Sequence, residues 1–130
     1  MTRRLAVLDD HQRVLARRLE ALRAALPDLV ANRVCAAAVI GSVAEGRARD
    51  GSDIDLVLVL RTGAPMRSDY RWWDDSIAAV LSEEPFPLQP VFVSRGSVRT
   101  EEPRLRRAIA NAIPIWDSED LFDDQSRPGA

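Results

Sequence analysis

The chain has 130 residues and no lysine, so its 18 permanently basic side chains are all arginines. This absence excludes Schiff-base chemistry, a lysine nucleophile and the lysine of a phosphate-binding P-loop. The single cysteine, Cys35, excludes an intramolecular disulfide, and its apolar neighbours in VCAAAVI predict a small buried side chain in a reducing compartment. The single histidine, His11, does not by itself make a zinc site, and we expect an ordinary surface residue.

Long apolar runs are also missing. No stretch approaches the roughly 18 residues that a membrane-spanning helix needs, and the N-terminus has no extended apolar core. We therefore expect a cytoplasmic protein that does not bind a membrane. The formal net charge of -2, from 18 basic and 20 acidic side chains, argues against extended binding to nucleic acid.

The spacing of apolar residues predicts helices alternating with strands. Leucines at steps of three, four and seven indicate an amphipathic helix from about residue 5 to residue 26, ended with the help of Pro27, with most of its arginines facing solvent. The unbroken apolar run of 34–40 and the run DIDLVLVL of 53–60 predict buried strands, and PVFVS predicts a third, short one.

Further helices and a tail complete this expectation. Residues 68–82 are predicted to form a helix with Ser68 as its cap, and RLRRAIANA indicates another. Three residues of the first of these helices are predicted to face inward: Ile77, Val80 and Leu81. The fold class is therefore α/β or α+β, in a single domain over 1–130, with an N-terminal helical segment over 1–30 and a flexible acidic tail over 117–130.

Two aspartates one residue apart open the second predicted strand. Side chains at i and i+2 of a strand point to the same face, so Asp53 and Asp55 present two carboxylates side by side. Two carboxylates at such a short separation repel each other unless a cation lies between them. Oxygen ligands in this small number suit Mg²⁺ or Mn²⁺, with water and substrate phosphates completing the coordination shell.

A Gly-Ser pair follows the first predicted strand. Gly41 lets the backbone approach a ligand closely, and free N–H groups at the next helical turn favour an anion, to which the Ser42 hydroxyl adds a donor. Either motif alone is common in turns and loops. If their strands are neighbours, a triphosphate on the Gly-Ser turn shares a metal with the two carboxylates, which is what phosphoryl or nucleotidyl transfer requires.

As a unit, GSVAEGRARDGSDIDLVLV resembles the G-S-x(10)-D-x-D signature of the DNA polymerase beta-like nucleotidyltransferase superfamily. In particular it looks like the minimal nucleotidyltransferase (MNT) group of small bacterial proteins, some of which are antitoxins beside HEPN-domain ribonuclease toxins. The resemblance implies a nucleotidyltransferase fold, with a small mixed sheet, helices mainly on one face and an N-terminal helix.

The resemblance also implies roles for particular residues. Gly41 and Ser42 would bind the phosphates of ATP or another nucleoside triphosphate, while Asp53 and Asp55 would be the metal-binding and catalytic carboxylates. Two arginines of the EGRAR turn would reach phosphates as charged donors, against the alternative of an ordinary solvated loop; they are Arg47 and Arg49.

The pattern departs from the superfamily at one position. Members that catalyse transfer usually supply a third carboxylate from the next core strand, and at the corresponding place this chain has Gln89, followed by Pro90. An amide cannot act as a base and is a weak metal ligand. Glu84, or its neighbour Glu83, is a substitute candidate by proximity in sequence alone.

The sequence therefore supports two hypotheses. In the first, the protein is a magnesium-dependent enzyme that transfers a nucleoside monophosphate, AMP from ATP, to an acceptor hydroxyl, which on a toxin–antitoxin interpretation belongs to a partner protein such as a HEPN-type toxin. In the second, it is a weak or inactive antitoxin-like module that acts by protein–protein contact. The adjacent Trp72 and Trp73 diverge by about 100° on a helix, so we expect one to pack inside and the other to be exposed, half-buried or in contact with a base or a partner.

Overall fold

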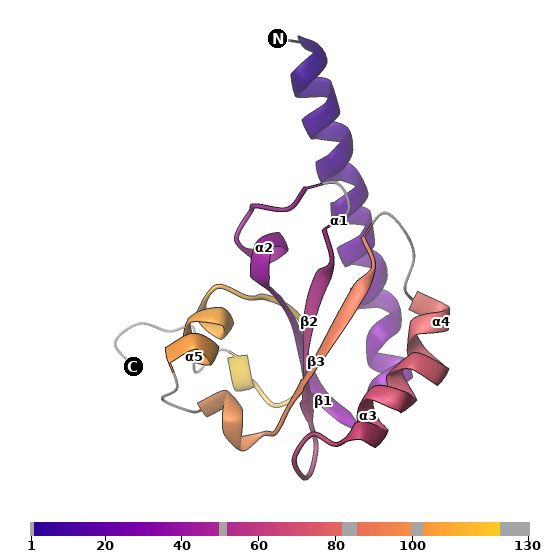
Figure 1. Ribbon diagram of the computed structural model, residues 1–130, viewed down its shortest axis with the longest axis vertical. Coiled ribbons are helices and arrows are strands. Elements are labelled where there is room, and N and C mark those ends of the chain that lie inside the picture. Colours follow the sequence, from indigo (N-terminus) through magenta and orange to yellow (C-terminus); the bar gives the residue numbers. More distant parts are fainter. Residues whose placement is uncertain (1, 50–51, 82–85, 100–102, 123–130) are drawn as a thin grey trace.

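The computed structural model describes residues 2–49, 52–81, 86–99 and 103–122, and it describes side chains from residue 12 onward. Figure 1 shows the order and arrangement of the elements. In chain order these are α1 Thr2–Val30, β1 Val34–Ile40, α2 Gly41–Ala44, β2 Ile54–Leu60, α3 Arg67–Trp72, the π-helix η1 Trp73–Ile77, α4 Ala78–Leu81, β3 Leu88–Val93, the 3-10 helix η2 Gly96–Arg99, α5 Pro103–Ala110 and β4 Ile113–Asp117.

The strands form one mixed sheet in the order β3-β2-β1-β4. β1 pairs antiparallel with both β2 and β4, whereas β2 pairs parallel with β3. The two central strands are those with unbroken apolar runs, which is expected because a central strand is covered on both faces. The predicted fold class is confirmed: a mixed α and β fold with a small mixed sheet behind an N-terminal helix.

Each face of the sheet has its own apolar cluster. Leu56 and Leu58 of β2 face a cluster that includes side chains of α1, η1 and α4, while Val57 and Val59 face a second cluster that includes Ile109 of α5. The alternation of side chains along β2 therefore separates the two layers. Most of the helical residues lie against the first face, as predicted, and α5 and η2 lie on the other.

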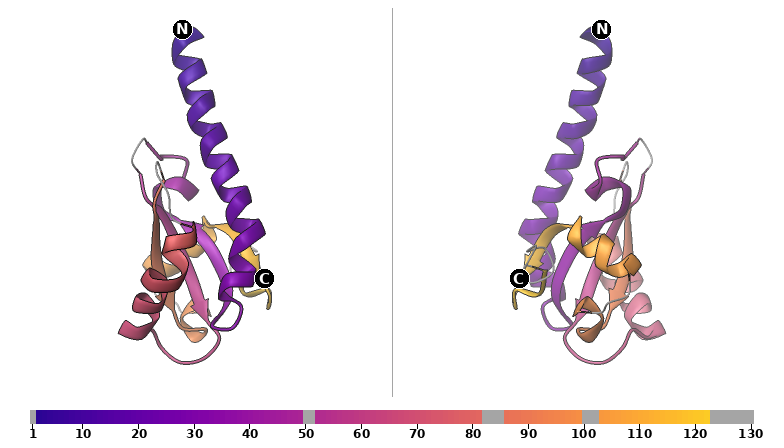
Figure 2. Two further views of the ribbon diagram at one scale, coloured as in Figure 1. Left: turned by 90° about the vertical axis from the view of Figure 1, so that its right-hand side faces the viewer. Right: turned by 90° about the vertical axis from the view of Figure 1, so that its left-hand side faces the viewer.

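Helix α1 differs from the prediction in two respects. It continues one turn past Pro27 to Val30, because Val30 is fully buried and the N–H of Ala31 donates to the carbonyl of Pro27 at 3.0 Å. Arg18 is buried rather than solvated, since it borders the leucine face that packs on the sheet. The N-terminal part of α1 projects beyond the sheet (Figures 1 and 2). Within the described ranges, neither α1 nor another helix is long and apolar enough to cross a membrane.

The segment from α3 to α4 begins at a cap other than Ser68. The carboxylate of Asp69 accepts the backbone N–H of Met66 at 2.9 Å and pairs with Arg33 at 3.3 Å, so Asp69 holds the first turn. Of the three residues predicted to face inward, Ile77 and Leu81 are buried, but Val80 is 66% exposed. Ile77 and Leu81 are four residues apart and share one face of the helix, whereas Val80 lies about 100° around the helix from Leu81 and is turned to solvent.

The two tryptophans take different positions. Trp73 is buried in the core, as expected of one of the pair. Trp72 is half-buried, and the guanidinium of Arg33 lies 4.4 Å from the centre of its ring. Because Arg33 covers that ring, Trp72 is not an open platform for a base.

Both edge strands contain a proline. In β3 the N–H of Phe92 points away from β2 and donates to the hydroxyl of Tyr70 at 3.2 Å, and Pro90, two residues earlier, has no N–H. In β4 the carbonyl of Pro114 accepts a hydrogen bond from Arg23 of α1 at 3.4 Å. The outer sides of the sheet are thus partly occupied by side chains of α3 and α1.

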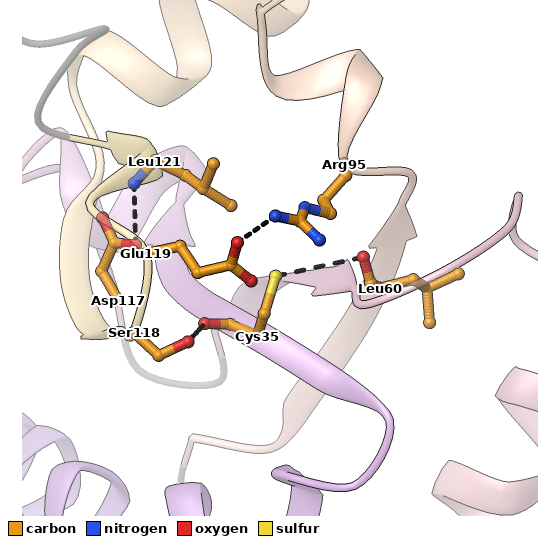
Figure 3. A network of polar contacts seen from close by, with 7 residues as sticks. All are labelled: Cys35, Leu60, Arg95, Asp117, Ser118, Glu119 and Leu121. Atoms are coloured by element: carbon orange, nitrogen blue, oxygen red, sulfur yellow. Dashed lines mark hydrogen bonds and ion pairs between the residues drawn. The ribbon is translucent and has the colours of Figure 1, made fainter.

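The predicted acidic tail is wrong for residues 117–122, which pack on the sheet. Figure 3 shows their contacts: Glu119 pairs with Arg95, and the hydroxyl of Ser118 donates to the carbonyl of Cys35 at 2.6 Å. The carboxylate of Asp117 accepts the N–H groups of the next helical turn, whose Leu121 and Phe122 are buried against the second face. Sequence composition suggested a tail because acidic residues alternate there with only two apolar anchors. Residues 123–130 lie outside the described part.

Candidate functional site

The Gly-Ser pair lies at the end of β1, where the chain turns into α2. Gly41 has a φ of +75°, which side-chain-bearing residues rarely adopt. The turn is closed by backbone bonds from Glu45 to the carbonyl of Gly41 at 3.0 Å and from Arg47 to the carbonyl of Ser42 at 2.7 Å. In Figure 1, α2 lies at the end of the sheet where β1 ends and β2 begins. The predicted short helical turn after the first strand is therefore present.

The carboxylate of Asp55 lies directly against Gly41. Ile40 pairs with Asp55 across β1 and β2, so the following residue, Gly41, is placed beside the Asp55 side chain. A Cβ atom added at Gly41 would lie 2.5 Å from Oδ2 of Asp55, a distance at which one of the two groups must move. Glycine is therefore favoured at position 41 by its backbone conformation, and the close approach of this carboxylate adds a second reason.

Asp53 and Asp55 lie close enough in space for their charges to interact. Asp55 is the second residue of the strand and shares the face of Val57, while Asp53 precedes the strand and is exposed. Burial raises the pKa of the Asp55 carboxyl, and the negative charge of Asp53 raises it further. Both effects disfavour two ionised carboxylates at this position, and a bound cation would relieve both.

Gln89 occupies the position predicted for the third carboxylate. In the parallel pairing of β2 with β3, Gln89 is the register partner of Asp55, and its side chain shares the face of Val91, as Asp55 shares that of Val57. Gln89 is exposed. Within the part of the chain that the structure describes, no group of three or more His, Cys, Asp or Glu side chains could hold a metal ion.

The other site residues predicted from the sequence form no hydrogen bond or ion pair with Gly41, Asp55 or Gln89 in the described part of the chain. Arg47 is an exposed partner of Glu45, at 3.0 Å. Arg49 is exposed, and its backbone N–H donates to the hydroxyl of Ser52 at 2.8 Å, which shapes the loop before β2. Glu84 and Glu83 lie outside the described residues.

The donor set fits a small divalent cation bound together with a ligand's own oxygens. Two carboxylates, with an amide at the third position, supply oxygen donors only, and Mg²⁺ prefers such donors with water or phosphate oxygens in the remaining places. The close contact at Gly41 leaves backbone next to Asp55, where a side chain would otherwise stand. The Gly-Ser turn and the carboxylate of Asp55 are therefore direct neighbours.

Comparison with known proteins identifies the family of the chain. The sequence model of the nucleotidyltransferase domain family matches residues 19–110, from α1 to the end of α5, and the chain therefore belongs to that family. A search of curated proteins found no match.

Among solved structures, the fold is similar to one described as "Crystal structure of the toxin-antitoxin with AMP-PNP". The TM-score is 0.54 at 12% sequence identity, over 80% of each chain. At this identity the likeness concerns the fold.

Sequence reasoning found the residues of the site but not their contacts. It did not predict that Asp55 would lie against Gly41, because this depends on the register between β1 and β2. It also overlooked Arg18, whose burial could have been suspected from its position next to Leu19 and four residues before Leu22 on the leucine face.

Proposed function

We propose that the protein is a magnesium-dependent nucleotidyltransferase that transfers AMP from ATP to an acceptor hydroxyl. The observation that carries the proposal is the contact between Gly41 and the carboxylate of Asp55, since it joins a phosphate-binding turn to a carboxylate pair that favours a cation. Membership of the nucleotidyltransferase domain family supports it.

In the reaction, the acceptor oxygen forms a bond to the α-phosphorus of ATP, the bond from that phosphorus to the bridging oxygen breaks, and pyrophosphate leaves with the electron pair. The hydroxyl proton passes to solvent or to a carboxylate. Gly41 and Ser42 hold the phosphates, and Asp53 and Asp55 hold Mg²⁺. The bound metal would neutralise phosphate charge as it develops.

The acceptor is proposed to be a hydroxyl on a partner protein, in a toxin–antitoxin pair. The similar fold of the toxin–antitoxin structure with AMP-PNP motivates this assignment. From the resemblance of its G-S-x(10)-D-x-D motif, we further propose that the chain belongs to the MNT group and that its partner is a HEPN-type toxin. A short helical reading frame of that type beside the gene would support the pairing.

The second candidate function is a weak or inactive binding module with the same fold, favoured by one observation. The residue in register with Asp55 on β3 is Gln89, which can neither accept a proton from the acceptor nor offer a charged ligand. On this alternative the protein would act on its partner by contact alone.

The metal assignment is tested by replacing both carboxylates. We expect Asp53→Asn with Asp55→Asn to abolish magnesium-dependent ATP binding in titration calorimetry while the fold is kept, because these side chains gain their role from a ligand and not from packing. The matched control is Asp74→Asn with Asp75→Asn, an adjacent exposed pair on η1. A double variant of the site that binds Mg-ATP as the parent does would show that the assignment is wrong.

The choice between enzyme and binding module is tested at Gln89. With labelled ATP, magnesium and the candidate partner, Gln89→Asp should increase transfer, since a carboxylate or general base contributes about 10² to 10⁴ in rate. A parent that already transfers AMP, and loses this activity as Glu84→Gln, would assign the third role to Glu84. An inert parent that stays inert as Gln89→Asp, yet binds the partner tightly, would establish the binding module instead.

A further inference from the structure

Arg18 is a buried charge at the border of the leucine face of α1 that packs on the sheet. Only 7% of it is exposed, and among the residues that the structure describes the other buried charged side chain is Asp69, which caps α3. Burying a guanidinium is unfavourable unless hydrogen bonds satisfy it. An aliphatic side chain would extend the leucine face of α1 without that penalty, so the position of the arginine calls for an explanation in terms of what it contacts.

Arg18 reaches the segment that leads into β3. Its Nε donates to the carbonyl oxygen of Phe86 at 3.3 Å. The next carbonyl, that of Pro87, accepts the N–H of Ile54 at 2.8 Å, and Ile54 is the residue between Asp53 and Asp55. Two successive carbonyls are thus held from opposite sides, one by α1 and one by the first residue of β2.

Holding the carbonyl of Phe86 also restrains Gln89, which follows three residues later and is in register with Asp55. Phe86 is 1% exposed and Leu88 7%, so the segment between the held carbonyls and Gln89 is packed in the core. We infer that Arg18 is a positioning residue that fixes position 89 against Asp55 as the third ligand position of the site, an inference that rests on the proposed function.

The chain offers a matched control for this hydrogen bond. Arg23 lies on the same helix and also donates to a backbone carbonyl, that of Pro114 in β4, at 3.4 Å. β4 lies at the other edge of the sheet from β3. Loss of the Arg23 bond removes the same kind of contact without touching the segment before Gln89.

The experiment measures binding of Mn²⁺ with ATP, counting the free ion by electron paramagnetic resonance. Gln89→Asp alone should tighten Mn²⁺ binding by about tenfold or more, because ligand charge sets affinity in such sites. Arg18→Met should remove most of that gain, in keeping with the roughly 10- to 100-fold effect of losing the support of a metal ligand. Arg23→Met should leave the gain intact.

Arg18→Gln separates positioning from packing. Glutamine has the length of methionine and places an N–H donor where Nε of the arginine stood, so it should preserve the gain, and it keeps the test decisive if Arg18→Met does not fold. In the metal-free protein, amide exchange gives a second measurement: the N–H of Ile54 should exchange faster in Arg18→Met than in Arg23→Met.

Three results would overturn the inference: a full gain in Arg18→Met, an equal loss in Arg23→Met, or no gain from Gln89→Asp in a parent that binds Mn²⁺ and ATP. In each of these cases the proposed function survives. If neither the parent nor Gln89→Asp binds the ion with ATP, the proposed function fails as well, so the two failures are distinguishable.

Discussion

Replacing Gly41 by alanine adds one carbon atom next to the site. The structure allows the resulting loss of stability to be separated into a backbone contribution and a side-chain contribution. An L-residue in the left-handed region costs about 1 to 2 kcal/mol. The new Cβ, 2.5 Å from Oδ2 of Asp55, also forces that carboxylate away, at about 0.5 to 1.5 kcal/mol for an off-rotamer side chain. Together these give a loss of about 1.5 to 3.5 kcal/mol in the free energy of unfolding.

Gly63→Ala is the matched control, because Gly63 has a φ of +76° and nothing within 4 Å of an added Cβ. It should show the backbone strain alone, lowering Tm by about 3 to 5 °C per kcal/mol for a chain of this size. In calorimetry Gly41→Ala should lose Mg-ATP binding and Gly63→Ala should keep it. In an Asp55→Ala background, Gly41→Ala should lower stability only as much as Gly63→Ala lowers that of the parent. Equal binding by the two glycine variants would refute this reasoning.

Three further predictions follow from other contacts. In EDTA at neutral pH, Asp55→Asn should raise Tm, because burial and the charge of Asp53 disfavour an ionised carboxylate at this position. The same variant should lose the further rise in Tm that Mg-ATP gives the parent. A fall in Tm in EDTA would contradict this. Burial, followed by the charge and hydrogen bond of Glu119, raises the pKa of the Cys35 thiol. A thiol reagent should therefore label the native protein at pH 8 far more slowly than the denatured protein. Rapid labelling of the native protein would be inconsistent with a buried thiol. Asp69→Ala removes a helix cap and an ion pair and should cost about 2 to 3 kcal/mol in urea unfolding, whereas the exposed Asp74→Ala should cost almost nothing; equal effects would argue against the cap.

The sequence predicted what depends on local pattern. The central strands were predictable because their apolar runs are unbroken. That Asp53 and Asp55 act as a pair stays a prediction. The place of Gln89 was anticipated from the resemblance, and the parallel pairing of β2 with β3 now gives it a neighbour.

What could not be predicted depends on packing between distant segments. Helix α1 passes Pro27 because Val30 is buried beyond it, and Val80 is exposed although Ile77 and Leu81 of the same segment pack on the sheet. Residues 117–122 read as a tail, yet Leu121 and Phe122 bury enough apolar surface to hold the segment. Each of these outcomes depends on which surface the segment meets in the folded protein.

The prolines of the two outer strands limit how this protein can meet another chain. An incoming strand needs a row of free donors and acceptors along a sheet edge, and here Pro90 lacks a donor, the N–H of Phe92 is taken by Tyr70, and the carbonyl of Pro114 is taken by Arg23. Edge-to-edge growth into fibres meets the same obstacle. The partner protein of the proposed function would therefore meet helix surfaces and loops, where substitutions can change the choice of partner without disturbing the pairing of the strands that hold Asp55.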